Sequence, residues 1–227
     1  MTKRTKIVLS VFVVLGALTV VGAGTFATFN AQAGNPGNLF ANGTLVLSNT
    51  KAGGTGACLS TGGGTTDSNV NNSCEQLFNL SVKKPGDSGS ANLTIKNEGS
   101  IAASALKVFS TACANADASA ETYHGTGLPC SKIQLYIQRY SDSGFTTPST
   151  CVYGGGTAST CDFSDTAKTL NAFQTAYNTS TSGLAIGSGL AVGSSGYFKV
   201  AVQLPSSADN TYQGRQATVD FTWYAEQ

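Results

Sequence analysis

Apolar and polar residues alternate at every second position in several stretches of this chain. In the last of these stretches one face carries threonine, aspartate and tyrosine, and the other face carries Ala217, Val219, Phe221 and Trp223. A period of two is typical of antiparallel strands with one buried face, and several such strands form a sandwich. The pattern predicts strands at 78–82, 91–96, 106–108, 133–138, 198–204 and 215–225. The expected fold class is therefore all-β, an antiparallel β-sandwich.

One segment has a helical period instead. Ser164 and Asp165 are suited to cap its start, and apolar residues then recur at helical spacing at Ala167, Leu170, Phe173 and Tyr177. We expect one short helix near 165–177, packed on the sheet. Stretches rich in glycine, serine, threonine and asparagine are expected to be loop insertions, at 49–73, 111–130, 141–162 and 179–196.

The first 28 residues have the organisation of a secretory signal peptide. A basic start at Lys3, Arg4 and Lys6 precedes an apolar run over 7–21 and then a stretch of small residues. The run is shorter than the about 20 apolar residues that a membrane-spanning helix needs. Segment 1–28 is therefore expected to be an N-terminal signal helix, and the protein to contact the membrane only while this signal is uncleaved. The chain beyond residue 28 is expected to be secreted.

All six cysteines lie downstream of the signal, which favours disulfides in an exported chain. Six cysteines allow 15 pairings. We favour the sequential one, because each successive pair brackets a stretch that resembles a long loop: Cys58 with Cys74, Cys113 with Cys130, and Cys151 with Cys161. The competing interpretation, a metal site, lacks a Cys-x-x-Cys motif, and the chain has a single histidine, His124.

Charge is sparse and balanced in this sequence. Only 11% of the 227 residues are charged, with 13 basic and 12 acidic side chains. A chain without a basic excess is not expected to bind nucleic acid. A polar surface with so little charge offers little repulsion against association with other copies.

Three groups of motifs, in order along the chain, resemble the TasA/camelysin family of secreted bacterial and archaeal fibre proteins. The first is similar to that family's export signal and first mature strand, and spans 24–30 and 40–47. The second contains Lys84-Pro85-Gly86-Asp87 and continues over 93–100. The third resembles the family's closing strand pair, at 200–204, 210–214 and 219–227. Residues 49–75 and 110–195 match no family motif, and the six cysteines also depart from its best-known members.

The resemblance implies a jelly-roll-like sandwich that polymerises outside the cell. It divides the chain into signal peptide 1–28, donor segment 29–43 and a single sandwich domain 44–227. A dedicated signal peptidase would cut between Thr28 and Phe29, and the freed segment would add a strand to the next copy. Because donor and acceptor are different surfaces, such contacts run head to tail and form a filament, either a biofilm matrix fibre or a pilus.

The donor strand implied by the resemblance is roughly 29–40, anchored by Phe29, Leu39 and Phe40. Pro36 cannot donate to a strand ladder, so the paired stretch is expected to be short or split there. The acceptor is expected to be the strand at 89–97 or the last strand. Ala31-Gln32-Ala33 is an alternative cleavage motif that would remove the start of the donor.

Two other classes of function compete with a structural subunit. Camelysin relatives imply a secreted metallopeptidase, but a peptidase zinc site needs more than His124, and the sequence has no His-Glu-x-x-His motif. No catalytic, metal-binding or cofactor-binding residue is therefore assigned, and the chain is not expected to be an enzyme. The third possibility is a monomeric adhesin or carbohydrate-binding β-domain whose polar loops form the contact surface.

Overall fold

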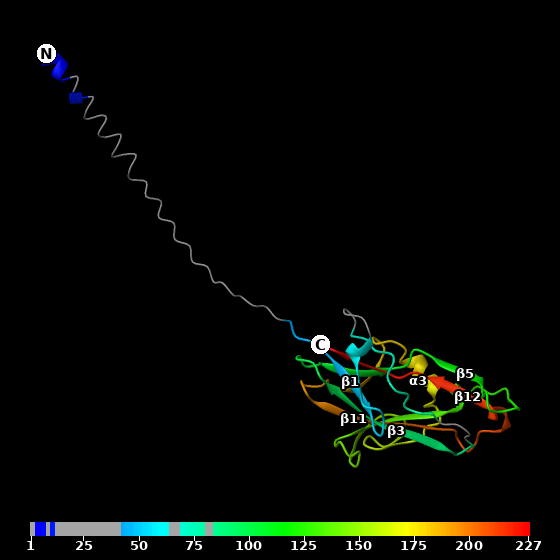
Figure 1. The fold of residues 1–227 in the computed structure, drawn as a ribbon. Coiled ribbons are helices and arrows are strands. Elements are labelled where there is room, and N and C mark those ends of the chain that lie inside the picture. Colours follow the sequence, from blue (N-terminus) through cyan, green and yellow to red (C-terminus); the bar gives the residue numbers. More distant parts are fainter. Residues whose placement is uncertain (1–2, 8–9, 12–41, 64–68, 80–83) are drawn as a thin grey trace. The chain divides into compact units, whose positions relative to one another are not determined.

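The structure is a computed structural model, and it describes residues 3–7, 10–11, 42–63, 69–79 and 84–227 (Figure 1). The chain divides into two compact units, 1–41 and 42–227. In the first unit, residues 3–7 and 10–11 are helical. The cleavage site at Thr28 and the expected anchors Phe29, Leu39 and Phe40 lie outside the described residues. Over the described part of the chain, no helix is both long and apolar enough to cross a membrane.

The second unit is built around a six-stranded sheet in which every pair is antiparallel. Its order is β2-β1-β3-β11-β6-β7, so β2 and β7 are its edges. The strands are β1 (Leu47–Lys51), β2 (Ala57–Leu59), β3 (Ser88–Asn97), β6 (Gln134–Tyr140), β7 (Pro148–Tyr153) and β11 (Ser195–Gln203). β3 and β11 form its centre, where Phe198 and Val200 lie opposite Leu93 and Ala91.

Shorter sheets form the second layer. One has the order β10-β4-β13, with β4 (Ala105–Phe109), β10 (Leu184–Gly187) and β13 (Thr222–Glu226). Another pairs β5 (Cys113–Asp117) with β12 (Arg215–Val219). The strand expected at 215–225 is therefore split into two strands, which pair with different partners. A two-stranded ribbon joins β8 (Gly155–Gly156) to β9 (Cys161–Asp162).

The core lies between the layers and confirms a mostly β, sandwich-like fold. Inward residues of both layers form one cluster of buried side chains, which includes Leu93, Ile95, Leu106, Val108, Leu135, Ile137, Phe198 and Val200. The alternation on β3 and β11 is visible in their burial, because every second residue of each is buried over most of its length. The period of two in the sequence therefore identified the correct faces.

Helices are few and short in the described residues: η1 (Ser60–Gly63), α2 (Pro129–Lys132), α3 (Leu170–Ala176) and η2 (Asn210–Tyr212). The helix expected near 165–177 is α3, and its stripe residues Leu170 and Phe173 are buried. Its start was wrong by five residues. Thr169 rather than Ser164 or Asp165 caps it, and the Thr169 side chain accepts a hydrogen bond from the Ala172 N–H at 3.2 Å.

One predicted strand and several predicted loops differ from the structure in the described residues. Phe78 and Asn79, the first residues of the strand expected at 78–82, are not in a strand, and 80–82 lie outside the described part. The expected loop insertions contain the short strands β2, β5, β7 and β10. β5 reads Cys-Ala-Asn-Ala-Asp and carries no apolar alternation, whereas β10 reads Leu-Ala-Ile-Gly and has only four residues.

Three disulfides join neighbouring cysteines in the sequential pairing: Cys58–Cys74, Cys113–Cys130 and Cys151–Cys161. Disulfides persist in oxidising compartments, so three of them are compatible with an extracellular protein. Each closes a short loop, with sequence separations of 16, 17 and 10 residues.

Candidate functional site

The last two strands expose an unpaired edge. β13 pairs with β4 on one side, and β12 pairs with β5 on one side. No other strand of the described residues lies against the opposite side of either. An unpaired edge presents main-chain N–H and C=O groups to any extended segment that approaches it.

β3 lies inside the six-stranded sheet. It pairs with β1 on one side and with β11 along its other side. Of the two acceptor strands expected from the sequence, the strand at 89–97 therefore has partners on both sides over 93–97 and on the β11 side alone over 89–92. The last strand retains a free edge.

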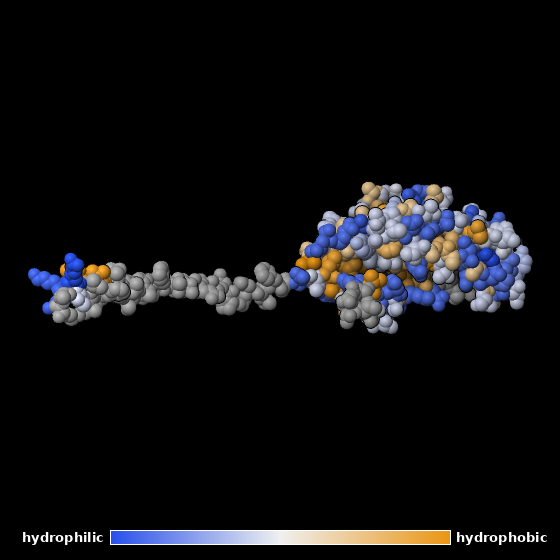
Figure 2. All heavy atoms as spheres, turned by 90° about the horizontal axis from the view of Figure 1, so that it is seen from above, coloured by the Kyte–Doolittle hydropathy of each residue, from blue (hydrophilic) through white to orange (hydrophobic). Residues whose placement is uncertain are grey.

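A cavity of about 1140 Å³ runs beside this edge. Its wall on the β12–β13 side contains Ala217, Val219, Phe221 and Trp223. Leu47, Ile95 and Val202 of the six-stranded sheet also line it. We call this space the edge groove. In the space-filling view, apolar residues are visible in a band between more polar regions of this unit (Figure 2).

The four apolar wall residues on the β12–β13 side are only half-buried, whereas Leu93 and Val108 of the core are fully buried. Trp223 packs on Phe198 with ring centroids 5.3 Å apart, and its indole N–H is buried without a hydrogen-bond partner among the described residues. Leaving a buried donor unsatisfied costs about 1–3 kcal/mol. The second layer therefore ends at β12–β13 with apolar surface and one donor unpaired.

On the other side of the edge groove lies an irregular segment that we call the strap, residues 69–79. Leu77 and Phe78 of the strap pack against the core cluster and line the groove. The strap lies over the inner face of β1 and β2, because the residues that bind it point to that face. Side chains alternate along a strand, so Asn49 and Lys51 share the inward face of Leu47, and Cys58 lies opposite Asn49.

The strap is attached to β1 and β2 by covalent and polar links. Cys74 is bonded to Cys58, and Asn71 donates its side-chain N–H to the Leu59 carbonyl at 2.8 Å. Glu75 pairs with Lys51 at 3.0 Å and accepts the Thr55 N–H at 2.9 Å. These contacts make the strap a fixed side of the groove.

The Glu75 carboxylate is held in its charged form by these contacts. The Thr55 N–H, followed by the Lys51 ammonium, lowers the pKa of Glu75 below its usual 4.5. Sequence reasoning missed this residue and the strap as a whole, because neither has a periodic pattern. The cysteine at 74 was the one local signal that this stretch is tied down.

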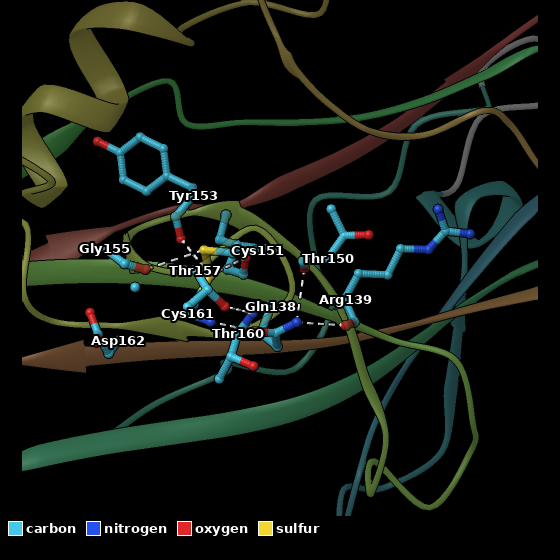
Figure 3. Close-up of a disulfide and its surroundings, with 12 residues drawn as sticks. Gln138, Arg139, Thr150, Cys151, Tyr153, Gly155, Thr157, Thr160, Cys161 and Asp162 are labelled. Carbon is cyan, nitrogen blue, oxygen red and sulfur yellow. Dashed lines mark hydrogen bonds between the residues drawn. A yellow bond between two sulfur atoms is a disulfide. The ribbon is translucent and has the colours of Figure 1, made fainter.

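The opposite flank of the sheet, around β6 and β7, is closed. Gln138 is buried there, and its side-chain N–H groups donate to the carbonyls of Arg139, Thr150 and Ser159 at 2.8–3.0 Å (Figure 3). Its side-chain oxygen accepts the Cys161 N–H at 2.6 Å. The Cys151–Cys161 loop is thereby fastened over the sheet with its polar groups paired.

Burial on this flank also affects Tyr153. Desolvation, with smaller contributions from Tyr177 and Asp165, raises the pKa of Tyr153 to about 12. The Lys168 ammonium lies 5.0 Å from the centroid of its ring. These groups belong to a packed interior and leave no open surface comparable with the edge groove.

His124 is held in a structural contact. Its Nδ1 lies 2.8 Å from the Gly214 carbonyl oxygen and 4.0 Å from an Asp117 carboxylate oxygen. Among the described residues, no three His, Cys, Asp or Glu side chains gather as a metal site.

Comparison with known proteins leaves the family open. No family model matches the chain, and no curated protein matches it. The resemblance to secreted fibre proteins therefore depends on the motifs in the sequence alone.

Proposed function

We propose that this protein is an exported structural subunit that polymerises head to tail into extracellular filaments. The segment 29–40 of one copy would lie in the edge groove of the next and pair with its free β12–β13 edge. Strand addition of this kind supplies main-chain hydrogen bonds for affinity and side-chain pockets for specificity. Each hydrogen bond contributes about 0.5–1.5 kcal/mol net, so several of them together with apolar anchors form a stable link.

The observation that carries the proposal is the edge groove beside an unpaired strand edge. Its volume, about 1140 Å³, exceeds the roughly 300–1,000 Å³ of typical small-molecule pockets. Among the described residues it runs beside an edge that lacks a partner strand, and apolar side chains such as Val219, Phe221 and Trp223 form part of its wall.

The proposed donor segment and the β12–β13 edge are both interrupted near the middle, which supports their pairing. The edge from Arg215 to Glu226 is broken at Asp220 and Phe221, between β12 and β13. The donor segment 29–40 has the same length, and glycines and Pro36 interrupt it near its middle. When the two are aligned end to end, the weak part of the donor falls opposite or beside the break in the edge. The proline then costs few of the possible ladder hydrogen bonds.

The test compares the secreted protein with a variant that lacks residues 29–40. Both are purified and examined under assembly conditions by electron microscopy and sedimentation. We expect filaments from the complete protein and monomers from the deletion variant. Identical filaments from both, or monomers from both, would contradict strand donation by this segment. N-terminal sequencing of the secreted protein checks that cleavage after Thr28 leaves the donor intact.

The competing functions predict other outcomes of the same preparation. A monomeric adhesin binds glycans without forming filaments. A metallopeptidase of the histidine type cleaves casein, and it loses that activity with a chelator and in His124→Ala. No contact in the described residues favours either over the structural subunit.

A further inference from the structure

The strap forms one side of the edge groove, and one disulfide holds it. Leu77 and Phe78 lie on the strap side of the groove, and Phe221 and Trp223 lie on the strand-edge side. An extended segment that fills the groove therefore contacts both sides. The edge supplies hydrogen bonds, whereas the strap supplies an apolar surface. How tightly the segment is held depends on how firmly the strap is fixed.

The Cys58–Cys74 disulfide is the covalent part of that attachment. Cys74 lies next to Glu75, whose carboxylate contacts Lys51 and Thr55. The Lys51 ammonium also donates to the Gln76 carbonyl at 2.9 Å, immediately before Leu77. These polar contacts are exposed, and exposed ion pairs hold a segment weakly. Without the disulfide, the strap would depend on these weak contacts and on the half-buried packing of Leu77 and Phe78 for its position.

We infer that the Cys58–Cys74 disulfide is a switch that makes the edge groove competent to accept a strand. The inference depends on the proposed function and adds a regulator to the same site. With both thiols reduced, the strap is loosely held and binds the donor poorly. When the disulfide closes, the strap is fixed over β1 and β2, and the groove has two firm sides. Polymerisation then begins only after the chain has reached an oxidising compartment.

The chemistry of this step is thiol–disulfide exchange. The Cys58 and Cys74 thiols lose two electrons and two protons together as the new sulfur–sulfur bond forms. The oxidant is a disulfide of a small molecule or of a thiol oxidoreductase outside the reducing cytoplasm, and it leaves as two thiols.

The test removes one disulfide at a time from the complete secreted protein. Cys58→Ala/Cys74→Ala removes the tether of the strap. Cys151→Ala/Cys161→Ala is the matched control, because that disulfide also closes a short loop but lies on the opposite flank of the sheet. We expect the critical concentration for polymerisation to rise by about tenfold or more in the first variant, the size of a 1.4 kcal/mol loss. In the control we expect it to stay near the wild-type value.

A second variant guards against simple misfolding. Phe78→Ala keeps all three disulfides and removes an apolar side chain of the strap that lines the groove. Phe163→Ala removes a half-buried aromatic residue that packs on Tyr136 instead, and serves as its control. Circular dichroism identifies any variant that has lost its fold. Phe78→Ala is expected to raise the critical concentration, whereas Phe163→Ala is not.

The outcomes separate this inference from the proposed function. If the wild-type protein forms no filaments, the proposed function fails and the switch fails with it. If the wild type forms filaments and Cys58→Ala/Cys74→Ala polymerises equally well or better, strand donation stands and the switch is wrong. Equal losses in both disulfide variants would also overturn it, because the effect would then be one of general stability.

Discussion

The two flanks of the six-stranded sheet each carry a disulfide loop, but one flank is filled and the other is open. Beyond β6 and β7, Gln138 fastens the Cys151–Cys161 loop to the sheet through paired polar groups. Beyond β1 and β2, the Cys58–Cys74 loop continues into the strap, and a cavity of about 1140 Å³ lies between the strap and the last strands. The chain is therefore able to close its layers completely. Because the flank beyond β6 and β7 is packed, we interpret the cavity beyond β1 and β2 as a binding site and not as loose packing.

The largest expected difference between the flanks concerns buried aromatic residues. Phe173→Ala removes a fully buried ring from the core between the layers and should cost about 3–5 kcal/mol of unfolding free energy. Phe78→Ala removes a half-buried ring beside the cavity and should cost the monomer about 1–2 kcal/mol. Urea unfolding of monomeric protein measures both. Equal losses would show that the edge groove is as tightly packed as the core.

The next effect concerns the buried amide of the closed flank. Gln138→Met keeps the approximate volume but leaves the Cys161 N–H without its acceptor, so the unfolding free energy should fall by about 1–3 kcal/mol. Filament formation should be unaffected, because the Gln138 side chain binds the Cys151–Cys161 loop and does not line the edge groove. The control is Gln216→Met at an exposed position of β12. No loss of stability in Gln138→Met would mean that this loop is held by its disulfide alone.

A smaller effect should follow from pH on the open flank. The pKa of Glu75 is lowered in the folded protein, so its contribution to stability is fully present above its usual 4.5 and is lost as the pH falls through the lowered value. The stability difference between wild type and Glu75→Gln should therefore shrink between pH 7 and pH 3. Urea unfolding at each pH measures it, with Glu121→Gln in another loop as the control. A difference independent of pH would contradict the strap contacts.

The smallest expected signal is spectroscopic. Trp223 is the only tryptophan of the chain, and it is half-buried in the wall of the edge groove. A strand added beside it should exclude water from the indole and shift its fluorescence emission to shorter wavelength during assembly. If filaments form and the emission wavelength does not change, the contact between copies lies on a surface other than the edge groove.

Local patterns were enough to predict much of this protein. The period of two located β3, β6 and β11, the apolar stripe located α3, and the cysteine order agrees with the three disulfides. Such features depend on residues near one another in the sequence. The same reasoning missed β5 and β10, two short strands inside expected loops that each pair with a strand far away in the sequence.

The sequence by itself determined a mostly β chain and the faces that its strands bury, and the secretory start stays a prediction. The tertiary structure alone decided which strands have partners. β3 looked like a possible edge, yet pairing with β1 and β11 places it in the sheet interior, while β12 and β13 keep a free side. The physical reason is that strand pairing joins residues far apart in the chain, such as Leu47 and Asn97, and alternation reveals which face is buried but not which edge is covered.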